Sequence, residues 1–174
     1  MAAQRIYDLR GRVCLVTGAT SGIGRETARG LAQSGASVLM VARDRARGAE
    51  VAAEIRSTGA PGSVEVLIAD LACRGDVRAL AGQVLQGHDR LDVLIHNAAA
   101  VNSTRRVTAE GIEATLAVNH LAPFLLTELL APLLQATPSP RVVTVSSYMH
   151  TRSQTFPGTI FNQNTTTARR RHTT

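Results

Sequence analysis

Short apolar runs alternate along the chain with longer stretches in which apolar residues recur every three or four positions. The apolar runs occupy residues 12–17 (RVCLVT), 37–42 (SVLMVA), 63–69, 92–96 (DVLIH) and 141–146 (RVVTVS). Uninterrupted runs of about four to eight apolar residues are typical of strands buried on both faces of a sheet. The pattern therefore predicts five buried strands.

Helical patterns fill the intervals, at residues 25–34, 45–57, 76–86 and about 108–135. Gly35 suits a left-handed cap at the end of the first helix, and Asp44 can cap the beginning of the second. Proline removes a backbone donor and clashes with the preceding turn, so we expect Pro123 to kink or interrupt the last helix.

Strands that alternate with helices favour a parallel sheet with right-handed crossovers and helices on both faces. We expect an α/β fold of the Rossmann type, a three-layer α/β/α sandwich whose sheet has about five strands in the order 3-2-1-4-5. Residues 1–150 would form this domain. Residues 151–174 are polar and low in complexity, which predicts a poorly ordered tail.

Composition narrows the class of protein. The 174 residues are 44% apolar and 18% charged, which is typical of a single globular domain. The formal charge is +6, and all 19 basic residues are arginines. They are scattered except for Arg169–Arg171, and no aromatic residues interleave with that run to form a stacking platform. We therefore expect no nucleic-acid partner.

The two cysteines, Cys14 and Cys73, show neither metal-ligand nor redox-motif spacing, so we expect a reduced, cytoplasmic protein without a bound metal. The chain opens without a charged-then-apolar leader, and no apolar run reaches about 18 residues. We expect neither secretion nor a membrane span.

A glycine-rich loop joins the first apolar run to the first helical pattern and reads TGATSGIG at residues 17–24. Glycines at such a junction permit a tight turn and a close approach of the backbone to a pyrophosphate, which the helix N-terminus attracts. The alternative is a purely structural turn. The residues expected to bind a nucleotide cofactor here are Gly18, Thr20, Ser21, Gly22, Ile23 and Gly24.

The end of the second apolar run distinguishes between nucleotides. An NAD site usually places Asp or Glu there, whereas this chain has Arg43, whose guanidinium can pair with a 2′-phosphate. We therefore favour NADP over NAD, the alternative being that Arg43 is a solvated surface charge. Asp70 and Leu71, after the third run, could contact adenine, or Asp70 could simply cap its loop.

These motifs, taken in order, resemble the short-chain dehydrogenase/reductase family and come nearest to its retinol-dehydrogenase-like branch. The resemblance covers roughly residues 10–150. It is carried by TGATSGIG, Asp70, Asn97-Ala98-Ala99, Val118–Leu121 with Pro123–Thr127, and Val142–Ser147.

The resemblance implies hydride transfer between NADP(H) and a small-molecule alcohol or carbonyl. It assigns Ser147 to orienting the substrate oxygen and Asn119 to a proton relay through water, and it places Asn97 beside the cofactor, where it stabilises the sheet. The family also uses Tyr-x-x-x-Lys, in which Tyr transfers the proton and Lys holds the nicotinamide ribose and lowers the pKa of the Tyr hydroxyl.

The Tyr-x-x-x-Lys pair is missing from this sequence. At roughly a dozen residues after the serine the chain has Phe161 and Thr165, at roughly two dozen it has His172, and it contains no lysine. We therefore expect a C-terminally truncated or divergent chain with little or no activity. The family's last strands would be missing, which would leave the fifth strand exposed.

The same loss predicts self-association through the helix at residues 119–134, which would leave six leucines partly exposed: Leu125, Leu126, Leu129, Leu130, Leu133 and Leu134. Three functions stay open. The chain is a shortened oxidoreductase, a non-catalytic NADP(H)-binding module, or a product that dimerises with longer relatives.

Overall fold

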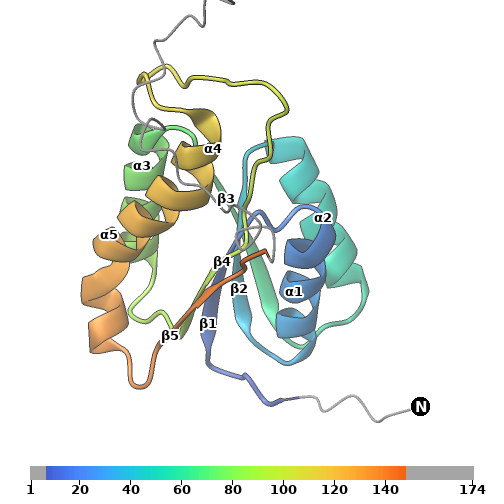
Figure 1. Ribbon diagram of the computed structural model, residues 1–174. Coiled ribbons are helices and arrows are strands. Elements are labelled where there is room, and N and C mark those ends of the chain that lie inside the picture. The colour runs from blue at the N-terminus through green and yellow to red at the C-terminus, as the bar shows by residue number, and fades with distance from the viewer. Residues whose placement is uncertain (1–6, 148–174) are drawn as a thin grey trace, which may run out of the picture.

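The computed structural model describes residues 7–147, and they form one parallel five-stranded sheet in the order β3-β2-β1-β4-β5 (Figure 1). The predicted α/β class and strand order are therefore confirmed. The strands are β1 Val13–Thr17, β2 Ser37–Ala42, β3 Ser63–Ile68, β4 Val93–His96 and β5 Arg141–Thr144. The predicted domain boundary at 150 and the tail at 151–174 lie outside the described residues.

Helices cover both faces of the sheet. In Figure 1, α1 and α2 lie to the right of the strands, and α3 and α5 lie to the left. Asp44 caps α2 by accepting the N–H of Arg47 at 2.8 Å, and Gly35 takes the left-handed conformation after α1, with φ 93°. The bounds are α1 Gly22–Gln33, α2 Arg45–Ser57, α3 Arg74–Gly87 and α5 Ala122–Ala136.

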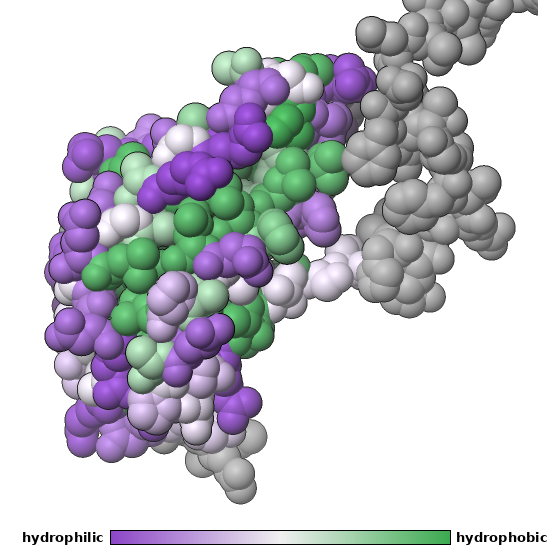
Figure 2. Space-filling model, turned by 90° about the vertical axis from the view of Figure 1, so that its left-hand side faces the viewer, coloured by the Kyte–Doolittle hydropathy of each residue, from purple (hydrophilic) through white to green (hydrophobic). Residues whose placement is uncertain are grey.

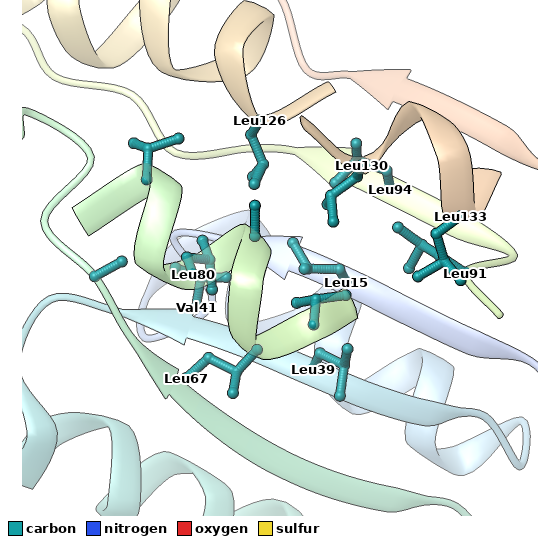
Figure 3. Close-up of a cluster of buried hydrophobic side chains, with 14 of the residues drawn as sticks. Leu15, Leu39, Val41, Leu67, Leu80, Leu91, Leu94, Leu126, Leu130 and Leu133 are labelled. Atoms are coloured by element: carbon teal, nitrogen blue, oxygen red, sulfur yellow. The ribbon is translucent and has the colours of Figure 1, made fainter. Parts of the chain in front are cut away.

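Each face of the sheet has its own apolar core because successive residues of a strand point to opposite sides. Leu15 and Leu94 face α3 and α5, where they pack with Leu80, Leu126 and Leu130 (Figure 3). The other face packs on α1 and α2 through Cys14, Val16, Val38, Met40, Ala28, Ala32, Val51 and Ile55. The sheet is thus firmly fixed between two layers.

The helix expected at about 108–135 begins only at Ala114, so this prediction was wrong at its N-terminal end. Residues before it form a tight turn in which the Thr108 N–H donates to the Ile112 carbonyl at 2.7 Å. The Glu113 carboxylate then accepts the N–H groups of Thr115 and Leu116 and starts the helix. A side-chain cap and a local turn therefore set this boundary, which apolar spacing could not reveal.

The same helix widens into a π-turn before Pro123. It passes from α4, Ala114–Leu116, through η1, Ala117–Leu121, into α5, and the Ala122 N–H donates to the Ala117 carbonyl five residues back. Pro123 cannot donate to the carbonyl four residues before it, and a wider turn also relieves the clash of its ring. The proline marks the interruption as expected, without ending the helix.

The expectation that all six leucines of α5 stay partly exposed was wrong. Leu126 and Leu130 are 1% and 0% exposed, and Leu133 and Leu134 are also buried, because α3 packs against this face. Leu125 and Leu129 are partly buried.

The expected exposure of β5 is confirmed within the described residues, where β5 forms one edge of the sheet. All four of its residues are exposed. Phe124 of α5 is 63% exposed, and Val142 and Val143 are exposed as well. Figure 2 shows a band of apolar residues on the α3 and α5 side of the molecule, bordered by hydrophilic ones.

One helical stretch, Ala114–Ala136, is long and apolar enough to cross a membrane by length and composition, with a mean hydropathy of 1.4. The apolar runs counted along the sequence did not show this, because polar residues such as Asn119, His120 and Glu128 interrupt them. In the fold, one face of this stretch contributes Leu126 and Leu130 to the core.

Candidate functional site

The site predicted from the sequence lies at the carboxyl ends of the strands. There β1 and β4 are neighbours although about 80 residues separate them, because the chain passes to the other side of β1 after β3. Open α/β sheets bind ligands at such a switch point, in the crevice beyond the strand ends. The loops after β1, β4 and β5 all meet at this edge.

The glycine-rich loop after β1 is packed too closely to accept side chains at two of its positions. Gly18 has φ 65°, and a Cβ there would lie 2.8 Å from the Cα of Ala98. A Cβ on Gly24 would overlap the Asn97 amide and the Gly18 carbonyl. Close packing at both positions, and the positive φ of Gly18, therefore demand glycine.

Side chains from β1 and β4 hold this loop in place. Asn97 Nδ2 donates to the carbonyls of Thr17 and Gly18, at 3.0 and 3.2 Å. The Thr17 hydroxyl accepts the N–H groups of Asn97 and Ala98, both at 3.0 Å, and donates to the Ile95 carbonyl. Asn97 thus acts as a brace for the loop. Thr17 was not predicted, although a polar residue that ends an apolar strand could have indicated it.

Helix α1 begins directly after this loop, and most of its first turn is exposed. Ser21 occupies the N-cap position with extended backbone, and within the described residues its side chain makes no capping hydrogen bond. Ser21, Gly22 and Ile23 are exposed, and Thr20 is half-buried. The first N–H groups of a helix have no partner within it and carry partial positive charge. The arrangement can bind an anionic phosphate.

The residues expected at the nucleotide end follow β2 and β3. Arg43 is exposed directly after β2, beside the beginning of α2. Asp70 is half-buried, as is Leu71, and Asp70 Oδ1 accepts the Ala72 N–H at 2.9 Å. The loop-cap interpretation of Asp70 is thus correct as a contact, and its role toward adenine stays a prediction.

Asn119 and Ser147 approach the site from the side of β4 and β5. Asn119 lies in η1, where its amide accepts the Ala100 N–H at 2.7 Å and donates to the Ala100 carbonyl at 2.9 Å. Ser147 is exposed and follows β5, whose Thr144 pairs with His96 of β4. Both residues lie at the carboxyl edge, as the sequence predicts.

His96, which sequence reasoning passed over, is buried at the end of β4. It is 5% exposed, and its Nε2 lies 2.8 Å from the Thr127 hydroxyl of α5. Burial lowers the pKa of its imidazole below the ordinary value of 6.5. The sequence signal that could have identified His96 is its position at the end of an apolar strand, directly before Asn97.

A buried carboxylate with two arginine partners lies at the opposite edge of the sheet. Asp92 is 4% exposed and accepts hydrogen bonds from the guanidinium groups of Arg12 and Arg90 and from the Val13 N–H. These hydrogen bonds outweigh the effect of burial and lower the pKa of the Asp92 carboxyl to about 2. Within residues 7–147, no three His, Cys, Asp or Glu residues are placed to bind a metal ion.

Comparison with known proteins gives consistent results. A family model described as short chain dehydrogenase matches residues 12–157. The Bos taurus protein "Dehydrogenase/reductase SDR family member 13" is 45% identical over 149 residues, which are 86% of this chain and 39% of that protein. Retinol dehydrogenase 14 of Mus musculus is 41% identical over 152 residues, 82% of this chain and 46% of that protein. The chain therefore spans less than half the length of these relatives.

Solved structures match the fold as well. A metagenomic short-chain oxidoreductase crystallised in complex with NADP has a TM-score of 0.72 and is 36% identical to this chain. The match covers 80% of this chain and 64% of that one. The similarity thus extends over most of this chain.

Proposed function

Because the chain belongs to the short chain dehydrogenase family, near its retinol dehydrogenases, we propose that residues 7–147 form the NADP(H)-binding part of an oxidoreductase. The observation that carries this proposal is the loop at Gly18 and Gly24, where no side chain fits and where the free end of α1 faces the same space. The NADP complex of the similar metagenomic enzyme supports the choice of cofactor.

The residues present fit a phosphorylated dinucleotide. The glycine loop and the first N–H groups of α1 would hold the pyrophosphate, and Asn97 keeps that loop in shape. Arg43 would pair with the 2′-phosphate through its guanidinium, and it is exposed and available for this role. Asp70 and Leu71 would border the adenine.

The proposed reaction is hydride exchange with an alcohol or carbonyl. NADP(H), when bound, supplies or accepts the hydride. Ser147 would orient the substrate oxygen, and Asn119 would hold a water for proton transfer. The 174 residues contain no lysine, and their two tyrosines, Tyr7 and Tyr148, do not stand at the family's spacing. We therefore propose that this polypeptide by itself binds cofactor with little or no turnover, since loss of a positioned general acid costs about 10²–10⁴ in rate.

Binding is tested by calorimetry with NADPH and NADH on the full chain. Arg43→Ala should weaken NADPH binding by about 10- to 100-fold, the range expected for hydrogen bonds to a charged group, and leave NADH binding unchanged. Arg47→Ala is the matched control, because Arg47 also lies near the beginning of α2 but pairs with Glu50. Equal effects of the two variants on NADPH would contradict the assignment.

Turnover is tested by following NADPH oxidation with a panel of aldehydes and ketones, retinal included. The proposal expects tight NADPH binding together with a rate barely above background. Ordinary steady-state turnover that Ser147→Ala abolishes would overturn the proposed lack of activity and leave the binding proposal intact.

A second candidate is an association module, and the exposed side chains of Phe124, Val142 and Val143 favour it. Apolar groups gathered on one face often mark an interface between proteins. Sedimentation over a range of concentrations distinguishes the candidates, because an association module forms dimers whether or not NADPH is bound.

A further inference from the structure

His96 is one of four polar or charged residues buried in the described chain, beside Thr17, Asp92 and Thr137. It lies two residues after the core residue Leu94, so its ring projects from the sheet toward α5, where it meets Thr127. It directly precedes Asn97, the brace of the glycine loop. A buried imidazole at this point connects the strand of the cofactor site to the helix that carries Asn119.

Hydrogen-bond geometry indicates which nitrogen of the ring carries a proton. The Thr127 hydroxyl has one proton, and it donates that proton to the Pro123 carbonyl at 2.8 Å. The 2.8 Å contact with His96 Nε2 therefore requires the ring nitrogen to donate. With its proton on Nε2 the ring can be neutral, and a second proton would have to enter at Nδ1 of a buried ring.

Hydrogen bonds join residues 96–100 to residues 119–127 at both ends of the two segments. His96 binds Thr127 at one end, and the amide of Asn119 binds the backbone of Ala100 at the other. Residues 96–100 and residues 119–127 thus form a closed ring of contacts. A change at His96 has one route to Asn119 through the helix and another through the loop.

We propose that His96 is a positioning residue, whose neutral ring sets how the Asn119 helix lies against the loop after β4, so that the placement of Asn119 depends on pH. The low pKa of the buried ring agrees with this role. Because the folded chain binds the proton less readily than the unfolded chain, this contact costs no stability above pH 6.5 and loses stability as the pH falls below that value.

Among the titratable side chains that line the groove around His96, only His96 itself is buried. The groove that contains His96 is also lined by His120 and Glu128 of the helix and by Val142 and Thr144 of β5. The two titratable side chains among these, His120 and Glu128, are exposed.

The first test is an NMR titration of the full chain from about pH 8 to about pH 5, the range in which histidines change charge. The Ala100 N–H and the Asn119 side-chain NH₂ signals should shift together with a midpoint below 6.5. His96→Gln keeps a donor near Nε2 and cannot titrate, so the shift should disappear. His120→Gln is the control and should retain it. A titration that survives in His96→Gln, or that disappears in His120→Gln, overturns the proposal.

If His96→Gln does not fold, a pair of variants at Thr127 tests the same contact. Thr127→Ser keeps the hydroxyl and should preserve the Asn119 signals at neutral pH, whereas Thr127→Val removes the acceptor and should move them. Identical spectra for the two variants would show that the His96–Thr127 contact does not position Asn119.

The cofactor measurement rests on the proposed function. Relative to His96→Gln, the wild-type affinity for NADPH should fall by about three- to tenfold between neutral pH and about pH 5.5, as for loss of one hydrogen bond between Asn119 and Ala100, since the Nε2–H bond to Thr127 remains when Nδ1 is protonated. The ratio of the two affinities cancels the titration of the 2′-phosphate. If neither protein binds NADPH while the Asn119 signals still titrate, the proposed function fails and the positioning role stands. A constant ratio despite binding contradicts an effect of His96 on the cofactor site.

Discussion

The two sides of the sheet edge that carries the candidate site differ in how firmly they are held. On the β1 side, the glycine loop is braced by Asn97 and Thr17 and packed so closely that Gly18 and Gly24 have no room for a side chain. On the β5 side, the strand is exposed along its length and Ser147 lies at the surface. Within residues 7–147, the glycine loop is thus closely packed and hydrogen-bonded, whereas β5 and Ser147 are exposed.

Cofactor binding and catalysis make different demands on the structure. A phosphate cradle needs backbone held rigidly at one strand–helix junction, and consecutive residues can supply it. Proton transfer and substrate binding need groups from several segments brought to one point. The first task needs one junction, and the second needs several segments.

The largest expected effect comes from comparing two residues of one helix, α5. Leu130 is 0% exposed and Phe124 is 63% exposed. Leu130→Ala should lower the free energy of unfolding by about 2–5 kcal/mol, because it leaves a cavity in the core. Phe124→Ala should change it by less than about 0.5 kcal/mol. Urea denaturation measures both, and similar losses would mean that something covers Phe124 in solution.

Acid should weaken the edge of the sheet opposite the candidate site, where Asp92 lies. The pKa of the Asp92 carboxyl lies near 2 in the folded chain, against 3.8 ordinarily, so its stabilisation is present above about pH 4 and lost as the pH falls toward 2. Denaturation at several pH values should show about 2 kcal/mol of this loss in the wild type and none of it in Asp92→Asn. Asp8→Asn is the control, because its ion pair with Arg10 is exposed.

Close packing around the glycine loop is tested by Gly24→Ala. Its Cβ would overlap backbone of the loop, and the forced shift should lower the free energy of unfolding by about 1–3 kcal/mol and weaken NADPH binding. Gly30→Ala lies on the same helix with open space around it and should instead raise stability by about 0.5–1 kcal/mol. Unaltered NADPH affinity in Gly24→Ala would show that the loop is less tightly held than its packing indicates.

The smallest effect on stability is expected at β5. Val143→Thr keeps the shape of a 43% exposed side chain and should change the unfolding free energy by less than about 0.5 kcal/mol. It should also reduce any self-association, as followed by sedimentation. Val38→Thr, at a fully buried position of β2, should cost about 1–3 kcal/mol. Equal costs would place Val143 in a covered interface.

Most of the fold was predictable because it depends on local patterns. Uninterrupted apolar runs located the strands, Asp44 and Gly35 marked helix ends, and the glycines located the loop that Asn97 braces. The helix at Ala114 and the burial of Leu126 were mispredicted for different reasons. The first depends on a cap from Glu113, and the second depends on how closely α3 packs against α5.

The candidate site was predictable as a set of residues and not as a set of contacts. Asn119 was identified by its motif, but its bonds to Ala100 depend on where a loop of the folded chain passes. His96 and Thr127 are far apart in sequence and meet only because α5 crosses the end of β4. Spacing along one chain carries no information about such pairs.

The π-turn at Ala117–Leu121 makes this helix sensitive to the insertion or deletion of a single residue. A single additional residue in a helix rotates everything after it by about 100°. The turn lets Asn119 reach Ala100 while Leu126 and Leu130 still face the core. A mutation that deletes one codon here would restore a regular helix and force the chain to give up one of these two contacts. We expect in-frame deletions in this stretch to do more damage than most substitutions.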